Sequence, residues 1–385
     1  MGLDTRRVRI IDVTHLFYKY AFGGKANLTT TLMIDGIPTL VDTTIPTLTI
    51  KQLYRWADGG YNPFVVCFDG KGCSRGRKAY FAYGKAAQQS GETVTYKATR
   101  DSQNDMFYKS INMTMQFLID GGVTCLKADN YEADDLIKAA VDRAKIDYPN
   151  MPIDIITGDQ DLLPLVDEQV SVYMASKKLT MAESEGLELR HYVQVTPRNY
   201  EKFVSGLTDF KTLSVPYNTV LLKKLLRGKK ADDIAGYPKF TPTKYNTLIA
   251  NMIADGVDIG NLFRYDAPTK TILRQDNQLP VSMEEFNACP VENRKHIYMT
   301  KFGEPPKLTE MCKVLSKYLD EATIKHIRFI YNGVNLNGAF AGDLPVGFQR
   351  RPCSLSKPIT GFMGGQLQAS VSKLQIRLPQ VDINY

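Results

Sequence analysis

The segment IDIITGD at residues 153–159 is an apolar run of β-branched residues that ends in a glycine and an aspartate. Two runs of the same kind lie upstream, RVRIIDV at residues 7–13 and PFVVCFD at residues 63–69. Short apolar runs bounded by turn residues are typical of strands that are buried on both faces. We therefore predict three buried strands whose carboxyl ends carry Asp12, Asp69 and Asp159.

Helical patterns separate these strands. Residues 104–119 and 131–145 carry apolar side chains at helical spacing among polar ones. Strands that alternate with helices favour an α/β fold with a mostly parallel central sheet and helices on both faces. In such a sheet the carboxyl ends of the parallel strands meet at one edge, where functional sites lie. The three aspartates are therefore expected to gather at that edge.

Further acids stand close to these strand ends in the sequence. Glu132 and Asp135 are three positions apart on a predicted helix and share a face, whereas Asp134 points away from Glu132 but can still border the site. Many carboxylates without histidine or cysteine at ligand spacing favour Mg²⁺ or Mn²⁺ over zinc, and such ions support hydrolysis of phosphoryl esters. The candidate set is Asp12, Asp69, Glu132, Asp134, Asp135, Asp159 and Asp161.

Each acid also has a purely structural interpretation. An aspartate at a strand end often caps the helix that follows it. The acidic run at residues 132–135 is also what the dipole of a helix favours in its first turn. Three strand-end acids together with an acidic helix start nevertheless favour a metal site over three independent caps.

Five segments carry a resemblance to a known family. In chain order they are IDVTHLFYKYAF (11–22), VVCFDGKG (65–72), YKATR (96–100), NYEADDLI (130–137) and ITGDQDLLPLV (156–166). Their order and spacing resemble those of the 5′ nuclease family, which has a PIN-like fold and comprises flap endonucleases, 5′→3′ exonucleases and phage RNase H-like enzymes. The resemblance covers roughly residues 5–255.

The resemblance implies two divalent metal ions and hydrolysis of phosphodiesters near 5′ ends. The first ion would be held by Asp12, Asp69, Glu132, Asp134 and Asp135. The second would be held by Asp159 and Asp161, together with Asp232. The YKATR segment is similar to a motif whose basic residues meet the scissile phosphate, which makes Lys97 and Arg100 candidate catalytic residues.

Two basic stretches are candidates for binding nucleic acid. Residues 70–110 form an arch-like insertion in which basic and aromatic side chains alternate, although a solvated basic loop would have the same composition. Residues 223–244 resemble the family's helix–three-turn–helix motif, which grips duplex DNA. The candidates are Lys78, Lys85, Tyr96, Lys223, Lys224, Lys230, Lys239 and Lys244.

Lys229 departs from the family pattern. In GKKADD, at residues 228–233, it stands where the family carries an aspartate that helps to hold the second metal ion. The exchange changes the local charge by two units, which weakens a divalent ion. We therefore expect a competent enzyme with a weak second metal site, which needs high Mg²⁺ or favours Mn²⁺.

The composition of the chain limits the class of protein to which it can belong. The chain has 385 residues and a net charge of +7, and its hydrophobic fraction of 43% is ordinary for a globular protein. No apolar run reaches the ~18 residues of a membrane span. The six scattered cysteines fit a reducing compartment, so we expect a cytoplasmic monomer in a bacterial or phage-infected cell.

The predicted organisation has three parts. Residues 1–195 form the catalytic domain, residues 196–260 a helical DNA-binding region, and residues 261–385 a C-terminal helical extension and tail of unknown role. The leading hypothesis is a 5′ nuclease that acts on 5′ ends, flaps or RNA primers of DNA, with a possible replication protein as partner. The alternatives are a DNA-binding relic without catalysis and a PIN-like structure-specific ribonuclease.

Overall fold

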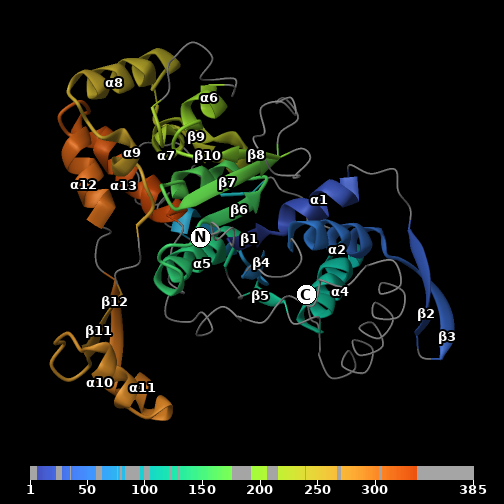
Figure 1. Cartoon of the computed structure of the whole chain (residues 1–385). Helices are drawn as coiled ribbons and strands as arrows, with labels where there is room; N and C mark the ends of the chain where they lie inside the picture. The colour runs from blue at the N-terminus through green and yellow to red at the C-terminus, as the bar shows by residue number, and fades with distance from the viewer. Residues whose placement is uncertain are drawn as a thin grey trace, which may run out of the picture.

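The computed structural model describes residues 7–22, 28–34, 36–57, 63–75, 77–78, 80–82, 96–98, 105–120, 123–127, 131–175, 192–205, 216–238, 240–266, 270–302 and 306–335. Figure 1 shows a central sheet with helices packed on both sides and a further helical part beside one edge. Among these residues, no helix is both long enough and apolar enough to cross a membrane.

The central sheet has six strands in the order β5-β4-β1-β6-β7-β8. β1 (Val8–Asp12) pairs in parallel with β4 (Phe64–Phe68) and with β6 (Ile153–Thr157). β5 (Thr124–Lys127) and β7 (Val170–Ala175) extend the parallel sheet, and β8 (Tyr192–Val195) is antiparallel to β7. The predicted mostly parallel α/β sheet is confirmed, and the three predicted strands are its centre.

Successive residues of β1 serve two different cores. Ile10 packs with α5 (Ala133–Asp147), whereas Ile11 packs with α1 (Thr14–Phe22), α2 (Thr44–Ala57) and α4 (Asp105–Asp120). Side chains alternate between the two faces of a strand, so a strand that is apolar throughout must be covered on both sides. This explains why the sheet has helices on both faces.

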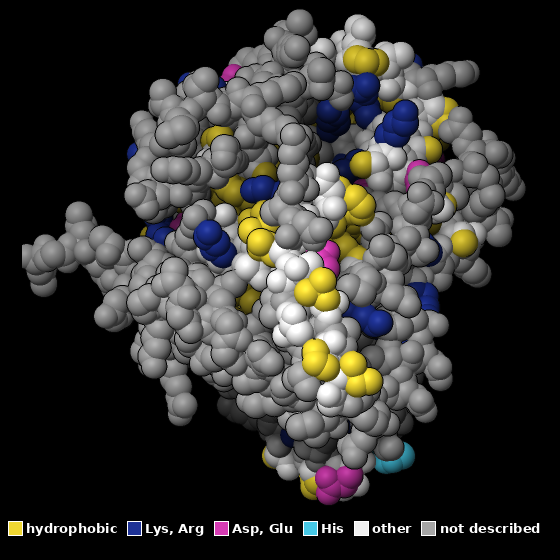
Figure 2. All heavy atoms as spheres, turned by 90° about the vertical axis from the view of Figure 1, so that its right-hand side faces the viewer, with side chains coloured by type: hydrophobic (Ala, Val, Ile, Leu, Met, Phe, Trp, Pro, Cys, Tyr) yellow, Lys and Arg dark blue, Asp and Glu magenta, His cyan; other side chains and the backbone are white. Residues whose placement is uncertain are grey.

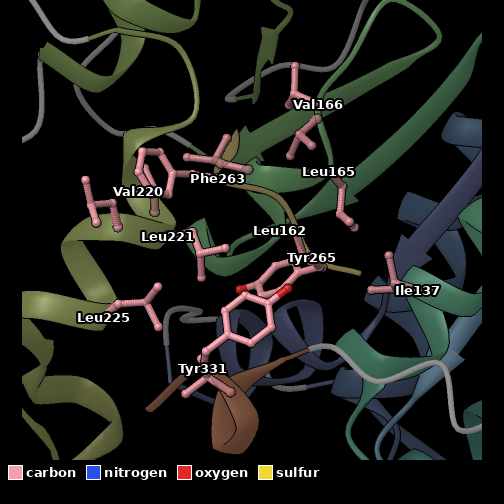
Figure 3. Close-up of a cluster of buried hydrophobic side chains, with 14 of the residues drawn as sticks. Ile137, Leu162, Leu165, Val166, Val220, Leu221, Leu225, Phe263, Tyr265 and Tyr331 are labelled. Atoms are coloured by element: carbon pink, nitrogen blue, oxygen red, sulfur yellow. The ribbon is translucent and has the colours of Figure 1, made fainter. Parts of the chain in front are cut away.

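A second group of helices packs against the 3₁₀ helix that follows β6. The 3₁₀ helix η2 (Gln160–Leu165) contacts α7 (Thr219–Arg227), and Leu162 lies beside Leu221 and Phe263 in Figure 3. α6 (Tyr200–Ser205) adds Tyr200 and Val204 to the same core. The region predicted to bind DNA therefore shares a continuous core with the central sheet.

A tight hairpin follows α7. β9 (Gly228–Lys229) pairs with β10 (Ile234–Ala235), and η5 (Lys230–Asp232) lies between them. Gly228 has a φ of 70°, and a Cβ there would lie 2.2 Å from the Ile234 carbonyl oxygen. Only glycine fits where the backbones of the two strands approach so closely, and Lys229 directly follows this glycine. The chain continues into α8 (Pro242–Ala254) and α9 (Ile259–Leu262).

The C-terminal part differs from its prediction. Helices α10 (Met283–Ala288), α11 (Val291–Ile297), α12 (Pro306–Leu315) and α13 (Glu321–Val334) are present. In addition, β11 (Lys270–Arg274) and β12 (Tyr298–Phe302) form an antiparallel pair, which was not predicted from the sequence. Figure 1 shows this pair and α10–α11 projecting away from the body. Two five-residue strands far apart in sequence leave little local signal.

Helix α13 reaches back to the start of the arch-like insertion. The Tyr80 ring stacks on Phe329 with 5.3 Å between ring centroids, and its hydroxyl donates to the Phe329 carbonyl. A Cβ on Gly333 would lie 2.4 Å from the Phe81 ring, so the helix and the ring are in close contact. Phe81 in turn stacks on Tyr96. The last described helix therefore supports Tyr80 and Phe81 directly, and Tyr96 through Phe81.

A hairpin projects from the opposite side of the molecule. β2 (Thr29–Ile34) pairs with β3 (Ile37–Asp42), and Ile37 and Leu40 are mostly exposed, as is Phe22 of α1. Figure 2 faces this side and shows hydrophobic side chains among scattered lysines and arginines.

Candidate active site

The three strand-end aspartates each accept a hydrogen bond from a backbone amide. Asp12 Oδ1 accepts from the Thr14 amide at 3.1 Å, and Asp159 Oδ1 accepts from the Asp161 amide at 3.0 Å, so these two cap the element that follows, as the capping interpretation predicts. Asp69 Oδ1 accepts from the Ala133 amide at 2.8 Å, at the start of α5 and 64 positions later in the chain. Because the three aspartates follow the neighbouring strands β4, β1 and β6, these hydrogen bonds hold three carboxylates at one edge of the sheet.

We call Asp12, Asp69 and Asp134 the open acid group. Within the described residues, none of them forms an ion pair with a lysine or an arginine. The Nδ1 atom of His15 lies 3.9 Å from Asp12 Oδ2, but burial lowers the pKa of His15 to about 4, so the ring is neutral at pH 7. Among the described residues, the nearby charge of Lys97 favours the charged forms of Asp69 and Asp134 but does not outweigh their burial.

The pKa values of the open acid group are raised by burial and by repulsion from neighbouring acids. Burial, followed by repulsion from Asp159, raises the pKa of Asp12 to about 6. Burial, followed by repulsion from Glu132 and Asp12, raises the pKa of Asp69 to about 6. Burial and the same neighbours hold the pKa of Asp134 well above its usual range. Crowded carboxylates of this kind favour a proton or a cation between them.

The donor chemistry of the open acid group fits a hard divalent cation. The acids of the group act on one another through their charges, and Mg²⁺ and Mn²⁺ prefer the oxygen ligands that carboxylates supply. Across the described residues, no three His, Cys, Asp or Glu side chains stand close enough to form a ready metal-binding set. The charge of the group therefore fits a divalent ion, and binding would draw its carboxylates together.

Glu132 and Asp135 lie beside the open acid group but bind basic side chains. Arg77 donates to Glu132 Oε2 at 2.6 Å and to Asp135 Oδ1 at 2.5 Å. Lys97 donates to Glu132 Oε1 at 2.6 Å, and the Tyr96 hydroxyl donates to Oε2 at 2.7 Å. Although burial opposes the charge of Glu132, Arg77 and Lys97 lower its pKa below the usual value.

In this structure the two acids are bound by basic side chains, and their predicted role as metal ligands stays a prediction. Glu132 and Asp135 do share a helix face, but the planar fork of the Arg77 guanidinium bridges them. Arg77 was not among the predicted site residues. Two acids three positions apart on a helix can both accept hydrogen bonds from one guanidinium. This spacing was the sequence signal that could have predicted an arginine partner.

Asp159, Asp161 and Asp232 form the lysine-bound acid group. Lys224 Nζ lies 2.5 Å from Asp161 Oδ2 and 3.4 Å from Asp232 Oδ2. Lys229 Nζ lies 2.9 Å from Asp159 Oδ1, 2.9 Å from Asp161 Oδ2 and 3.3 Å from Asp232 Oδ2. Two ammonium groups thus hold three carboxylates.

The ammonium groups outweigh burial at these acids. Burial alone would raise the pKa of Asp161, but Lys224 and Lys229 hold it well below its usual range. Burial would also lower the pKa of Lys229, and the charges of Asp161, Asp159 and Asp232 hold it above its usual value. Asp161 and Lys229 therefore both remain charged at neutral pH.

Two predicted nucleic-acid contacts are buried instead. Tyr96 is 5% exposed, stacks on Phe81 and donates to Glu132, so it presents no free face to a base. Lys224 is 7% exposed and binds Asp161 and Asp232, so its ammonium does not reach solvent. The structure thus places both side chains in the interior, which a basic or aromatic composition does not reveal.

The other predicted nucleic-acid contacts lie at the surface or outside the described residues. Lys78, Lys230 and Lys244 are exposed, and Lys223 is partly exposed. Lys85, Arg100 and Lys239 lie outside the described residues. The accessible lysines come from the arch-like insertion, from the hairpin after α7 and from α8.

Replacing Arg77 tests the cost of the buried acid pair. We expect Arg77→Met to lower the free energy of unfolding by about 2 to 3 kcal/mol, because two buried acids lose their guanidinium while Lys97 remains on Glu132. Urea denaturation measures this change. Arg143→Met is a matched control, since it removes a more exposed i,i+4 pair with Asp147 and should cost less than about 1 kcal/mol. Equal losses in the two variants would contradict a special role for Arg77.

The chain is similar to one family model and to several DNA polymerase I proteins. Residues 7–191 match the family model described as the 5′-3′ exonuclease N-terminal resolvase-like domain. The DNA polymerase I of Mycobacterium tuberculosis is 30% identical over 146 residues, which cover 37% of this chain and 14% of that protein. The thermostable DNA polymerase I of Thermus filiformis is 29% identical over 211 residues, or 55% of this chain and 22% of that protein. The matched segments thus span a small part of each polymerase.

Solved structures with weaker similarity include two nucleases. A T5 5′-exonuclease with bound divalent zinc ions matches with a TM-score of 0.41 and 13% identity, over 86% of this chain and 100% of that chain. The catalytic core of Rad2 in complex with a DNA substrate matches with a TM-score of 0.36 and 14% identity, over 97% and 93%.

Proposed function

We propose that the chain is a divalent-metal-dependent 5′ nuclease, because its residues 7–191 match the model of the 5′-3′ exonuclease N-terminal domain. It would hydrolyse phosphodiesters at 5′ ends, flaps or RNA primers of DNA. The observation that carries the proposal is the open acid group. Asp12, Asp69 and Asp134 are held at one edge of the sheet, and their raised pKa values favour a bound cation over an empty site.

The open acid group would hold the metal ion. A divalent ion bound there supplies hydroxide at neutral pH and stabilises the leaving oxygen. Asp159 would border the same site, because its charge acts on both Asp12 and Asp134. The chain's own part is to fix these carboxylates through the caps at Thr14, Ala133 and Asp161.

Lys97 is the proposed cation for the reacting phosphate. Its ammonium lies on Glu132 beside the open acid group and over the Tyr96 ring, 5.1 Å from the ring centroid. Its side chain is 17% exposed. A fixed cation at this position stabilises the charge that develops on a phosphate in the transition state.

The accessible lysines would bind the nucleic-acid backbone. Lys78, Lys223, Lys230 and Lys244 carry positive charge on several elements around the sheet edge, and phosphate contacts dominate such binding. A single-strand/duplex junction would meet the arch-like insertion on one side and the hairpin and α8 on the other. A role in replication, with a replication protein as partner, is part of this proposal.

One assay separates the proposed nuclease from its alternatives. We expect Mg²⁺- or Mn²⁺-dependent release of short products from 5′-labelled flap, nicked and RNA-primed duplexes, and slower cleavage of single strands. Binding without cleavage at any metal concentration would favour a non-catalytic relic. Cleavage confined to single-stranded or folded RNA would favour a structure-specific ribonuclease.

A further inference from the structure

The lysine-bound acid group differs from the open acid group because lysine side chains bind its carboxylates directly. Its three carboxylates already touch two ammonium groups, which leave one uncompensated negative charge. Asp161 Oδ2 is shared by Lys224 Nζ at 2.5 Å and by Lys229 Nζ at 2.9 Å. A divalent ion on that oxygen would therefore lie within a few ångströms of two positive charges, which disfavours it strongly.

The fold holds both lysines in this position. Lys224 is on α7, whose apolar side chains pack against η2 and α13, and its side chain is 7% exposed. Lys229 is on the hairpin whose close backbone approach requires Gly228, and its side chain is 24% exposed. Neither ammonium is an exposed group that can simply turn away into water.

The acids of the group are fixed as well. Asp161 and Asp232 are 6% and 2% exposed, and Asp161 is held in η2 by the Asp159 cap. The backbone carbonyl of Asp232 also accepts from the Lys97 amide at 2.9 Å, which links this group to the proposed phosphate contact. The cluster is thus a closed, hydrogen-bonded unit beside the open acid group.

We propose that Lys224 and Lys229 take the place of a second divalent ion, so that the chain binds one ion at the open acid group and not two. This inference rests on the proposed function only for the identity of the first site. Lys229, the more exposed lysine, supplies positive charge toward a substrate phosphate. An ammonium group cannot activate water as a metal ion does, so nucleophile activation falls to the open acid group alone.

The test counts bound ions without nucleic acid. Mn²⁺ is titrated into the full chain by equilibrium dialysis, and free Mn²⁺ is measured by its electron paramagnetic resonance signal. We expect one ion per chain for the parent and two for Lys229→Asp, which removes an ammonium and adds a carboxylate. Lys229→Met should bind a second ion more weakly than Lys229→Asp.

Matched variants keep the result unambiguous. Lys230→Asp makes the same charge change on a neighbouring exposed residue and should bind one ion, like the parent. Asp69→Asn should lose the first ion. The Lys229 side chain takes no part in the backbone pairing of the hairpin, so both of its variants should fold, and circular dichroism checks this.

The outcomes separate this inference from the proposed function. Two ions on the parent, or one ion on both the parent and Lys229→Asp, would overturn it. A parent that binds no ion would overturn both the inference and the metal dependence of the proposed function. One ion on the parent and two on Lys229→Asp, without cleavage of any substrate, would support the inference and refute the nuclease.

Discussion

Asp69→Asn is expected to lower the rate of metal-dependent cleavage on the order of 100-fold or more, with nearly unchanged DNA affinity. The amide oxygen of the asparagine can still accept from the Ala133 amide, so the cap of α5 is preserved. What is lost is one negative charge of the open acid group, and with it the attraction for a divalent ion. Single-turnover cleavage at saturating enzyme measures the rate, and fluorescence anisotropy in Ca²⁺ measures the affinity.

The same variant is expected to stabilise the metal-free protein. The pKa of Asp69 rises from 3.8 to about 6 on folding, so the folded chain binds more protons than the unfolded chain between these values. Stability therefore falls as the pH rises from about 4 to about 6, and above pH 6 the full cost of up to about 3 kcal/mol is present. Asp69→Asn should raise the Tm in EDTA at pH 7 and abolish the stabilisation that Mn²⁺ gives the parent.

Asp276→Asn is the matched control for both measurements. Asp276 is largely exposed and pairs with Arg274 at the end of β11, far from the acids in sequence and on a separate hairpin. It should leave both cleavage and Tm close to those of the parent. Parent-like cleavage by Asp69→Asn would remove the open acid group from the mechanism.

Lys97→Met is expected to reduce single-turnover cleavage about 100-fold while the dissociation constant for DNA changes only a few-fold. Methionine keeps the aliphatic stem over the Tyr96 ring, and Arg77 still neutralises Glu132, so the fold should survive. The missing ammonium affects the transition state more than the bound ground state, because charge develops on the phosphate only during the reaction.

Lys78→Met provides the contrast for Lys97. Lys78 is exposed on the same insertion, so its loss should weaken binding and reduce its salt dependence without changing the single-turnover rate at saturation. Equal losses of rate and affinity in Lys97→Met would make Lys97 an ordinary phosphate contact. Lys97→Arg should recover part of the rate, since the charge is kept.

The centre of the fold could be predicted from the sequence because its signals are local. β1, β4 and β6 are short apolar runs that end in or near an aspartate, and the pattern of each needs no distant partner. β5 has only four residues, of which Leu126 alone is buried, so little pattern was available. The β2–β3 hairpin was missed although its sequence contains Asp35–Gly36, a common hairpin turn.

The site was only partly predictable for a related reason. The acids were found because strand ends and helix starts concentrate them at one edge. Their cationic partners come from distant segments, since Arg77 is 58 positions from Asp135 and Lys229 is 70 positions from Asp159. Local patterns cannot pair such residues. Lys229 was nevertheless expected to face the acids, and its ammonium does contact Asp159, Asp161 and Asp232.

The contact between α13 and the arch-like insertion sets an order of events during synthesis. The Tyr80 hydroxyl binds a carbonyl 249 positions later in the chain. All eight acids of the site are translated well before Phe329, so the sheet edge that carries them can form on the ribosome. The support behind Phe81 and Tyr96 is absent until α13 has emerged. In a nascent chain, the segment that bears Lys97 would therefore be held by Glu132 and Asp232 well before α13 adds its support behind Phe81.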